Sequence, residues 1–240
     1  MLIRFRRPFP PWLLGVVICA LLIACSKPTA EELLVAAQRH IAENSPAAAQ
    51  IELRNAIQAA PNNGLAHRLL GTVLLRQGDP AAAEAAFRKS LGLEQKPENV
   101  LPSLALALLR QGQAQKLVDE FGGTQLQDPT AQAALRASVG HAWLLRGEVK
   151  PAAEAFAAAV LAQPDNASAQ FGRARIAAHE SRLDDAMALT DAALKSDPRL
   201  VEGHVFKSQL LMSRDQRPSA IESLEKALAA DGSYLPARLA

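Results

Sequence analysis

Residues Gly64–Gln95 read GLAHRLLGTVLLRQGDPAAAEAAFRKSLGLEQ, and this stretch decides the fold of the chain. It contains two amphipathic runs joined by a turn at Gly78. Apolar residues recur at helical spacing in the first run and end at this glycine, a usual helix stop. Pro80 opens the second run, where a proline suits the first helical turn. Small residues such as Gly71 alternate with bulky ones such as Phe87, so two helix backbones can approach closely. The stretch therefore predicts a helical hairpin.

This hairpin resembles the tetratricopeptide repeat (TPR), a unit of about 34 residues. Prolines recur at the end of the expected second helices, and they divide the chain into six consecutive units: Ala30–Asn63, Gly64–Pro97, Glu98–Ala131, Ala133–Asn166, Ala167–Leu200 and Val201–Tyr234. Units one to three cover residues 30–131, units four to six cover 133–234, and Gln132 is one extra residue between them. One hairpin cannot bury its apolar face alone, so neighbouring units must stack on it. The resemblance implies an all-α, right-handed TPR solenoid.

Two places depart from the repeat. In the third unit, Gly122-Gly123 follow directly on the second helix, and glycine is poorly tolerated inside helices. We expect a short helix near Ala114–Phe121, followed by an irregular bridge. At the other end, residues 235–240 read as the beginning of a further first helix. We therefore expect the chain to be a truncated member of its family, or to end on a surface that another molecule covers.

The first residues have the layout of a bacterial lipoprotein signal. Met1–Arg7 carries three arginines and no acid, and Trp12–Ala24 is an apolar run that is short for a membrane span. The run ends in Leu-Ile-Ala before Cys25, which resembles a lipobox with Cys25 as the acylated residue. We expect residues 1–24 to be removed and residues 25–29 to form a lipidated tether. A plain transmembrane anchor with an incidental Cys25 is the alternative.

Lipidation of Cys25 implies a location in the cell envelope. Several acyl chains hold a protein durably on a membrane. Ser26 follows the cysteine, and an aspartate there would signal retention at the inner membrane. We therefore expect anchoring to the periplasmic side of the outer membrane, with the inner membrane as the less favoured alternative.

Composition and motifs argue against catalysis. The chain is 49% hydrophobic but only 4% aromatic, which suits closely packed Ala- and Leu-rich helices. Without residues 1–24, 23 basic residues face 24 acidic ones, so the charge gives no reason to expect a nucleic-acid partner. The five histidines are scattered, with no spacing that suits a metal. Phosphate-binding loops and nucleophile elbows are absent from the sequence. We expect a protein that is not an enzyme and needs no cofactor or metal.

The TPR resemblance also implies a binding groove lined by the first helix of each unit. Polar residues at the matching positions are Arg68, Thr72, Arg76, Arg110, His141, Arg175, His179 and Gln209, and apolar ones are Leu75, Leu109, Phe171 and Met212. Four arginines around an aromatic residue can hold an acidic or C-terminal peptide segment, or an anionic glycan, through charge-assisted hydrogen bonds. The alternative is that these arginines only keep exposed helices soluble.

Longer phrases resemble a narrower group, the TPR-repeat lipoproteins of the PEP-CTERM/exosortase system (PrsT type). These phrases are IELRNAIQAAPNNGLAHRLLGTVLLRQGDPAAAEAAFRKSLGL, ENVLPSLALALLRQGQAQKLVDEF and SYLPARLA. The resemblance implies an outer-membrane-anchored scaffold that gathers partners for exopolysaccharide export or for sorting of PEP-CTERM proteins. Two alternatives remain: a lipoprotein of outer-membrane protein or pilus assembly, and the non-catalytic repeat part of a longer glycan-modifying protein.

Overall fold

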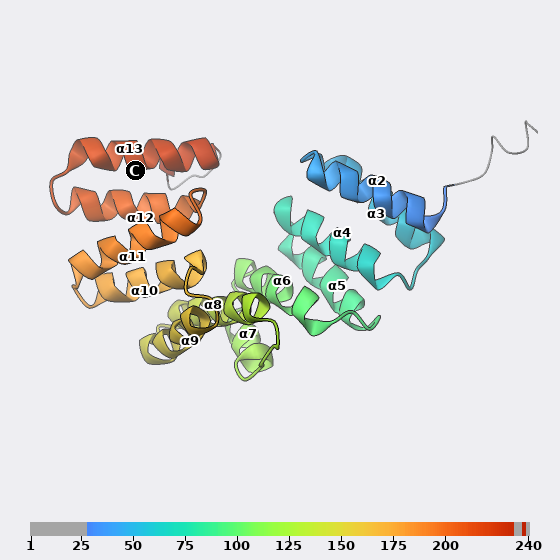
Figure 1. Cartoon of the computed structure of the whole chain (residues 1–240), viewed down its shortest axis with the longest axis horizontal. Coiled ribbons are helices and arrows are strands. Elements are labelled where there is room, and N and C mark those ends of the chain that lie inside the picture. Colours follow the sequence, from blue (N-terminus) through green and yellow to red (C-terminus); the bar gives the residue numbers. More distant parts are fainter. Residues whose placement is uncertain (1–27, 233–236, 239–240) are drawn as a thin grey trace, which may run out of the picture. The chain divides into compact units, whose positions relative to one another are not determined.

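A computed structural model describes residues 28–232 and 237–238 of the chain (Figure 1). Within those residues every regular element is an α-helix, which confirms the all-α prediction. The helices are α2 (Ala30–Ala42), α3 (Pro46–Ala59), α4 (Gly64–Arg76), α5 (Pro80–Leu91), α6 (Pro97–Arg110), α7 (Ala114–Phe121), α8 (Pro129–Leu145), α9 (Val149–Ala162), α10 (Ala167–His179), α11 (Leu183–Ser196), α12 (Val201–Met212) and α13 (Arg217–Ala230).

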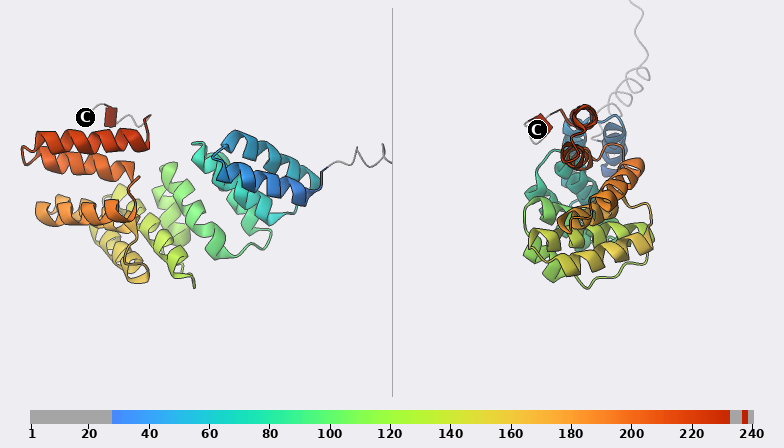
Figure 2. Two further views of the ribbon diagram at one scale, coloured as in Figure 1. Left: turned by 45° about the horizontal axis from the view of Figure 1, so that its top comes forward. Right: turned by 90° about the vertical axis from the view of Figure 1, so that its left-hand side faces the viewer.

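The chain divides into two compact parts, residues 1–61 and 62–240. In the N-terminal part, α2 and α3 pack together as one hairpin. In the C-terminal part, α4 with α5, α8 with α9, α10 with α11 and α12 with α13 form hairpins, and α6 with α7 a weaker one (Figure 2). The first helices α4, α6, α8 and α10 also touch in succession, and we call them with α12 the first-helix layer. This stacking is that of a TPR solenoid.

Local chemistry explains where the hairpins turn. The residue at the turn adopts a positive φ, and it is glycine at Gly78, Gly112 and Gly147. In the last two hairpins Ser181 and Asp215 stand at this place with φ of 61° and 57°. Only glycine adopts this conformation without strain, although Asp does so more readily than most residues. The backbone geometry of the turn is thus kept even where the glycine is absent.

Close helix packing depends on glycines facing buried phenylalanines. The Phe156 ring of α9 is fully buried, and it lies against Gly140 of α8 and Gly172 of α10. A Cβ atom placed on Gly172 would lie 2.1 Å from this ring, and one on Gly140 would lie 2.6 Å from it. These contacts leave no room for a side chain at either glycine. Phe87 and Gly71 repeat the arrangement between α5 and α4.

The third hairpin has the short second helix that the glycine pair predicts. Helix α7 has 8 residues, whereas α9 has 14. The segment between α7 and α8 is held by Arg136 of α8, whose guanidinium donates to the carbonyl oxygens of Gly122 (2.7 Å) and Thr124. The bridge is therefore irregular in backbone but anchored by a buried side chain.

The start of α8 differs from the expected boundary between the third and fourth units. Asp128 caps the helix by accepting from the amide of Ala131 at 2.7 Å, and Pro129 occupies its first turn. Since a capping aspartate followed by proline is a strong start signal, the helix begins before Ala133. The residue expected to be extra, Gln132, lies inside α8 and accepts a hydrogen bond from the amide of Leu126.

Near the C-terminal end, Ala237 and Arg238 are helical, and the Ala237 side chain is buried against Val205 and Ala227. Within the described residues, none of the helices combines the length and apolar character needed to cross a bilayer. The expected signal segment 1–24 and the expected lipidation residue Cys25 lie outside the described residues.

Candidate functional site

The first-helix layer of the C-terminal part is strongly basic. Its five helices carry seven Lys and Arg residues but only two acids, Glu98 and Glu202, each in the first turn of its helix. The second helices of the same part carry nine acidic and seven basic residues, so the excess of positive charge is confined to the first helices. Of the four groove arginines Arg68, Arg76, Arg110 and Arg175, none forms an ion pair with another described residue. Their positive charges are therefore available to a partner.

One group of candidate residues lies where the C-terminal ends of α4 and α6 meet. The Arg110 guanidinium donates to the carbonyl oxygen of Leu75 at 2.9 Å, which brings it next to Arg76 along the chain. Arg76 and Arg110 are both exposed. A guanidinium at a helix C-terminus is favourable because it meets the negative end of the helix dipole. The contact places the Arg110 guanidinium at the C-terminal end of α4, the helix that carries Arg76.

Arg68 and Thr72 lie earlier on α4 and are half-buried. The Thr72 hydroxyl donates to the carbonyl oxygen of Arg68 at 3.1 Å, so it is satisfied within its own helix. The Nε atom of Arg68 is buried and has no hydrogen-bond partner within the part of the chain that the structure describes. Buried donors without a partner are rare in folded proteins. Arg68 thus has a buried donor that is left without a hydrogen-bond acceptor.

A second group surrounds His141 on α8. Its Nε2 atom lies 3.2 Å from the carbonyl oxygen of Ser168 on α10, and its ring packs edge-on against Phe156 at 4.9 Å between centroids. Phe171 is buried beside it, with the ring centroids 6.4 Å apart. Burial and then the positive charge of Arg175 lower the pKa of His141 to about 4. The imidazole is therefore neutral at pH 7, and Arg175 supplies the charge of this group.

The remaining candidates lie apart from the arginines. His179 is exposed at the end of α10. Gln209 and Met212 of α12 line a cavity of about 490 Å³ that α12 and α13 form together. The apolar candidates Leu75 and Leu109 belong to the core around α4–α8. The structure thus brings the expected groove residues together in two groups, at α4–α6 and at α8–α10, and it places Gln209 elsewhere.

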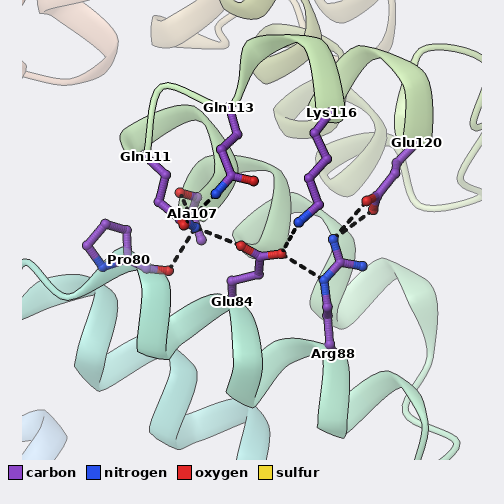
Figure 3. Close-up of polar contacts among 8 residues, drawn as sticks. All are labelled: Pro80, Glu84, Arg88, Ala107, Gln111, Gln113, Lys116 and Glu120. Atoms are coloured by element: carbon purple, nitrogen blue, oxygen red, sulfur yellow. Dashed lines mark hydrogen bonds and ion pairs between the residues drawn. The ribbon is translucent and has the colours of Figure 1, made fainter.

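Sequence reasoning missed the polar cluster around Glu84 (Figure 3). This carboxylate on α5 accepts from Lys116 Nζ at 2.7 Å, from Arg88 Nε at 2.8 Å and from Gln111 Nε2 at 2.9 Å. Arg88 also contacts both carboxylate oxygens of Glu120 at 2.9 Å. Burial raises the pKa of Glu84, but its three hydrogen-bond donors and the charge of Lys116 outweigh that effect and lower it to about 2. The cluster ties the second hairpin to the short third one.

The described residues include no group of three or more His, Cys, Asp and Glu side chains arranged to hold a metal ion. What the geometry provides is a stack of helical hairpins with one basic layer. This arrangement defines a helical-repeat scaffold. A family model described as "Tetratricopeptide repeat" matches residues 34–100 and 146–200, so the chain belongs to the TPR family. TPR proteins are typically non-catalytic scaffolds that bind protein or peptide partners.

Among curated proteins the chain is similar to "Cellulose synthase operon protein C" of Xanthomonas axonopodis pv. citri (strain 306), with 31% identity over 149 residues. The match covers 59% of this chain and 10% of that protein. The chain therefore spans only a small part of this much longer relative. It is a TPR scaffold with distant homology to that protein.

Solved structures show the same fold. The chain resembles a chain of the APC/C hetero-tetramer Cut9–Hcn1 with a TM-score of 0.70 and 16% identity, covering 93% of this chain and 44% of the other. It resembles PilW, titled a widely conserved type IV pilus biogenesis factor, with a TM-score of 0.66 and 16% identity, covering 89% and 99%. At these identities the likeness concerns the fold alone.

Proposed function

We propose that this protein is a lipid-anchored periplasmic scaffold that uses its first-helix layer to hold anionic partners during exopolysaccharide export or PEP-CTERM (exosortase) protein sorting. The observation that carries the binding proposal is the basic layer itself. Arg68, Arg76, Arg110 and Arg175 have no acidic partner among the described residues, and nine of the eleven acids on the helices of this part lie on the second helices. Such an imbalance favours an acidic or C-terminal peptide segment, or an anionic glycan, through charge-assisted hydrogen bonds.

Two observations support the proposed location and the link to polysaccharide export. The similarity to a protein named for a cellulose synthase operon favours a role connected with an exported polysaccharide. The sequence before Cys25 has the lipoprotein layout, and Ser26 after it favours the periplasmic side of the outer membrane. Pilus assembly is the competing role, and its support is the likeness to PilW, which extends over nearly all of that protein but is confined to the fold.

The binding proposal is tested by replacing Arg68, Arg76, Arg110 and Arg175 with Gln. Each exposed charge contributes at most about 1 kcal/mol, so single variants should lose about fivefold or less in affinity. The quadruple variant should bind oligoglutamate and polyglucuronate at least about tenfold more weakly, with a flatter salt dependence. Affinities measured by calorimetry at two salt concentrations give both quantities.

The matched control removes four exposed positive charges outside this layer, at Arg54, Lys89, Lys96 and Lys150. This control should keep the wild-type affinity and salt dependence. If both quadruple variants lose the same affinity, only net charge matters and the basic layer is not a site. If the groove variant aggregates while its monomeric fraction binds normally, the arginines serve solubility.

The anchoring proposal is tested with Cys25→Ala. Without the acyl-accepting thiol, the precursor should keep its signal segment, which is visible as a larger mass of the purified chain. Normal processing and membrane retention of Cys25→Ala would show that Cys25 is not lipidated.

The cellular role is tested by deleting the gene for this protein. Deletion should reduce exopolysaccharide export and leave type IV pili intact; the reverse pattern would favour pilus assembly.

A further inference from the structure

A cavity of about 700 Å³ lies between α11, α12 and α13, away from the two groups of groove candidates. Helix α11 supplies Leu194 and Lys195, and the connection to α12 supplies Pro198 and Arg199. Figure 1 shows these three helices at the C-terminal end of the described chain. Cavities of about 300–1,000 Å³ are the size that holds small ligands in proteins. The cavity has the size of a ligand site, and its lining decides which ligand fits.

Positive charge dominates this lining. The basic residues Lys195, Arg199, Lys207 and Lys226 line the cavity, together with the acidic Asp191. Lys207 pairs with Asp191 at 2.6 Å, and Lys226 pairs with Glu222 at 2.6 Å. These two ion pairs fix the positions of two ammonium groups. Lys195 and Arg199 have no ion pair with any described residue, so two positive charges remain uncompensated.

Two buried polar side chains in the same cavity have unused hydrogen-bonding capacity. Ser223 of α13 is only 5% exposed, yet its hydroxyl forms no hydrogen bond with the described residues. His204 of α12 is 7% exposed, and its Nε2 atom donates to the carbonyl oxygen of Pro198 at 2.9 Å, which leaves Nδ1 without a partner in the described part of the chain. Buried polar groups normally have partners. The unpartnered buried atom is Nδ1 of His204, whereas the Ser223 hydroxyl is a free donor at the cavity that a ligand oxygen can accept from.

We propose that this cavity binds a ligand through its phosphate group. The donors are three ammonium groups, one guanidinium and one hydroxyl, and they come from three helices and a connection. Lysine acts as a point charge with donors in several directions, whereas a planar carboxylate is matched best by the fork of an arginine. A tetrahedral oxyanion can accept from separate donors around it. Lys195, Arg199 and Ser223 form the core of the site, and the paired Lys207 and Lys226 add charge at its edge.

The first experiment titrates inorganic phosphate into the purified full chain in non-ionic detergent, against chloride at the same ionic strength. Amide resonances of residues 195–207 and 219–230 should shift with phosphate only. Lys195→Gln/Arg199→Gln should weaken phosphate binding about tenfold, because it removes both uncompensated charges. The control Lys89→Gln/Arg54→Gln removes one lysine and one arginine elsewhere and should bind phosphate as the wild type does.

Ser223→Ala separates recognition from general charge. The hydroxyl has no partner in the described chain, and alanine is the better helix former, so stability should not fall. A hydrogen bond to a charged acceptor is strong enough that its loss should weaken phosphate binding about tenfold. If Ser223→Ala and Lys195→Gln/Arg199→Gln both bind phosphate like the wild type, or if the control loses as much affinity as they do, the site does not exist.

The source of the phosphate is distinguished with vesicles. Phosphatidylglycerol in phosphatidylcholine vesicles should compete with inorganic phosphate if the natural ligand is a lipid headgroup. Vesicles of phosphatidylcholine alone provide the baseline for membrane attachment of the full chain. Competition assigns the site to an anionic lipid, and phosphate binding without competition assigns it to a soluble phosphate compound. Absence of both effects overturns the proposal.

Discussion

Gly172→Ala should destabilise the protein by about 2–3 kcal/mol, although the same exchange in an ordinary helix interior stabilises by about 1 kcal/mol. The added Cβ atom would lie 2.1–2.6 Å from three atoms of the Phe156 ring. This ring is fully buried, and on its other side it lies against Gly140 of α8. Because the ring cannot move away, α9 and α10 must separate. Urea unfolding followed by circular dichroism gives the change in free energy.

Gly92→Ala is the matched control for this substitution. Gly92 follows α5 with φ of −66°, and a Cβ atom there would approach the nearest atoms at 3.6 Å, an ordinary contact. The control should therefore cost nothing. Adding Phe156→Leu to Gly172→Ala should cost less than the sum of the two single changes, since the smaller side chain relieves the clash. Additive costs, or a stabilising Gly172→Ala, would show that the ring does not hold the two helices at this distance.

Glu84→Gln should reduce stability at pH 7 by about 2 kcal/mol and remove part of the acid sensitivity of the protein. The Glu84 side chain is only 12% exposed and its pKa lies at about 2, below the ordinary 4.5. A lowered pKa in the folded state means that the carboxylate stabilises the fold above the unfolded pKa. This contribution is lost as the pH falls from about 4.5 towards about 2. Lys116 and Arg88 are partly exposed, so solvent screening reduces the effect below the full shift.

The measurement is the urea midpoint at several pH values between 7 and 2. Across this range the wild type should lose the stabilisation that the Glu84 carboxylate provides. The urea midpoints of the wild type and of Glu84→Gln should therefore converge at the acid end. Glu222→Gln is the control, because Glu222 also has a lowered pKa through Lys226 but is fully exposed. It should change the curve little. If the urea midpoints of the wild type and Glu84→Gln change with pH in parallel, protonation of Glu84 is not coupled to folding.

The sequence by itself determined the helices and most of their ends. Apolar residues at helical spacing, capping side chains such as Asp79 and prolines in first turns act within a few residues of each other, so they are readable without the fold. The glycine pair after Phe121 likewise predicted the short α7. Family positions also predicted that Arg68, Arg76, Arg110 and Arg175 line one groove, which stays a prediction.

Only the tertiary structure decided the features that join helices distant in the chain. Glu84 meets Lys116 across 32 residues, and nothing near either residue in the sequence indicates the pair. Nor does the local sequence indicate that Arg136 donates to the backbone carbonyl of Gly122 after α7. The packing of Phe156 between two glycines and the cavity lined by Ser223 also depend on which helices meet. Helix formation follows from local hydrogen bonds and periodicity, whereas burial, pKa shifts and cavities depend on which faces meet when hairpins stack.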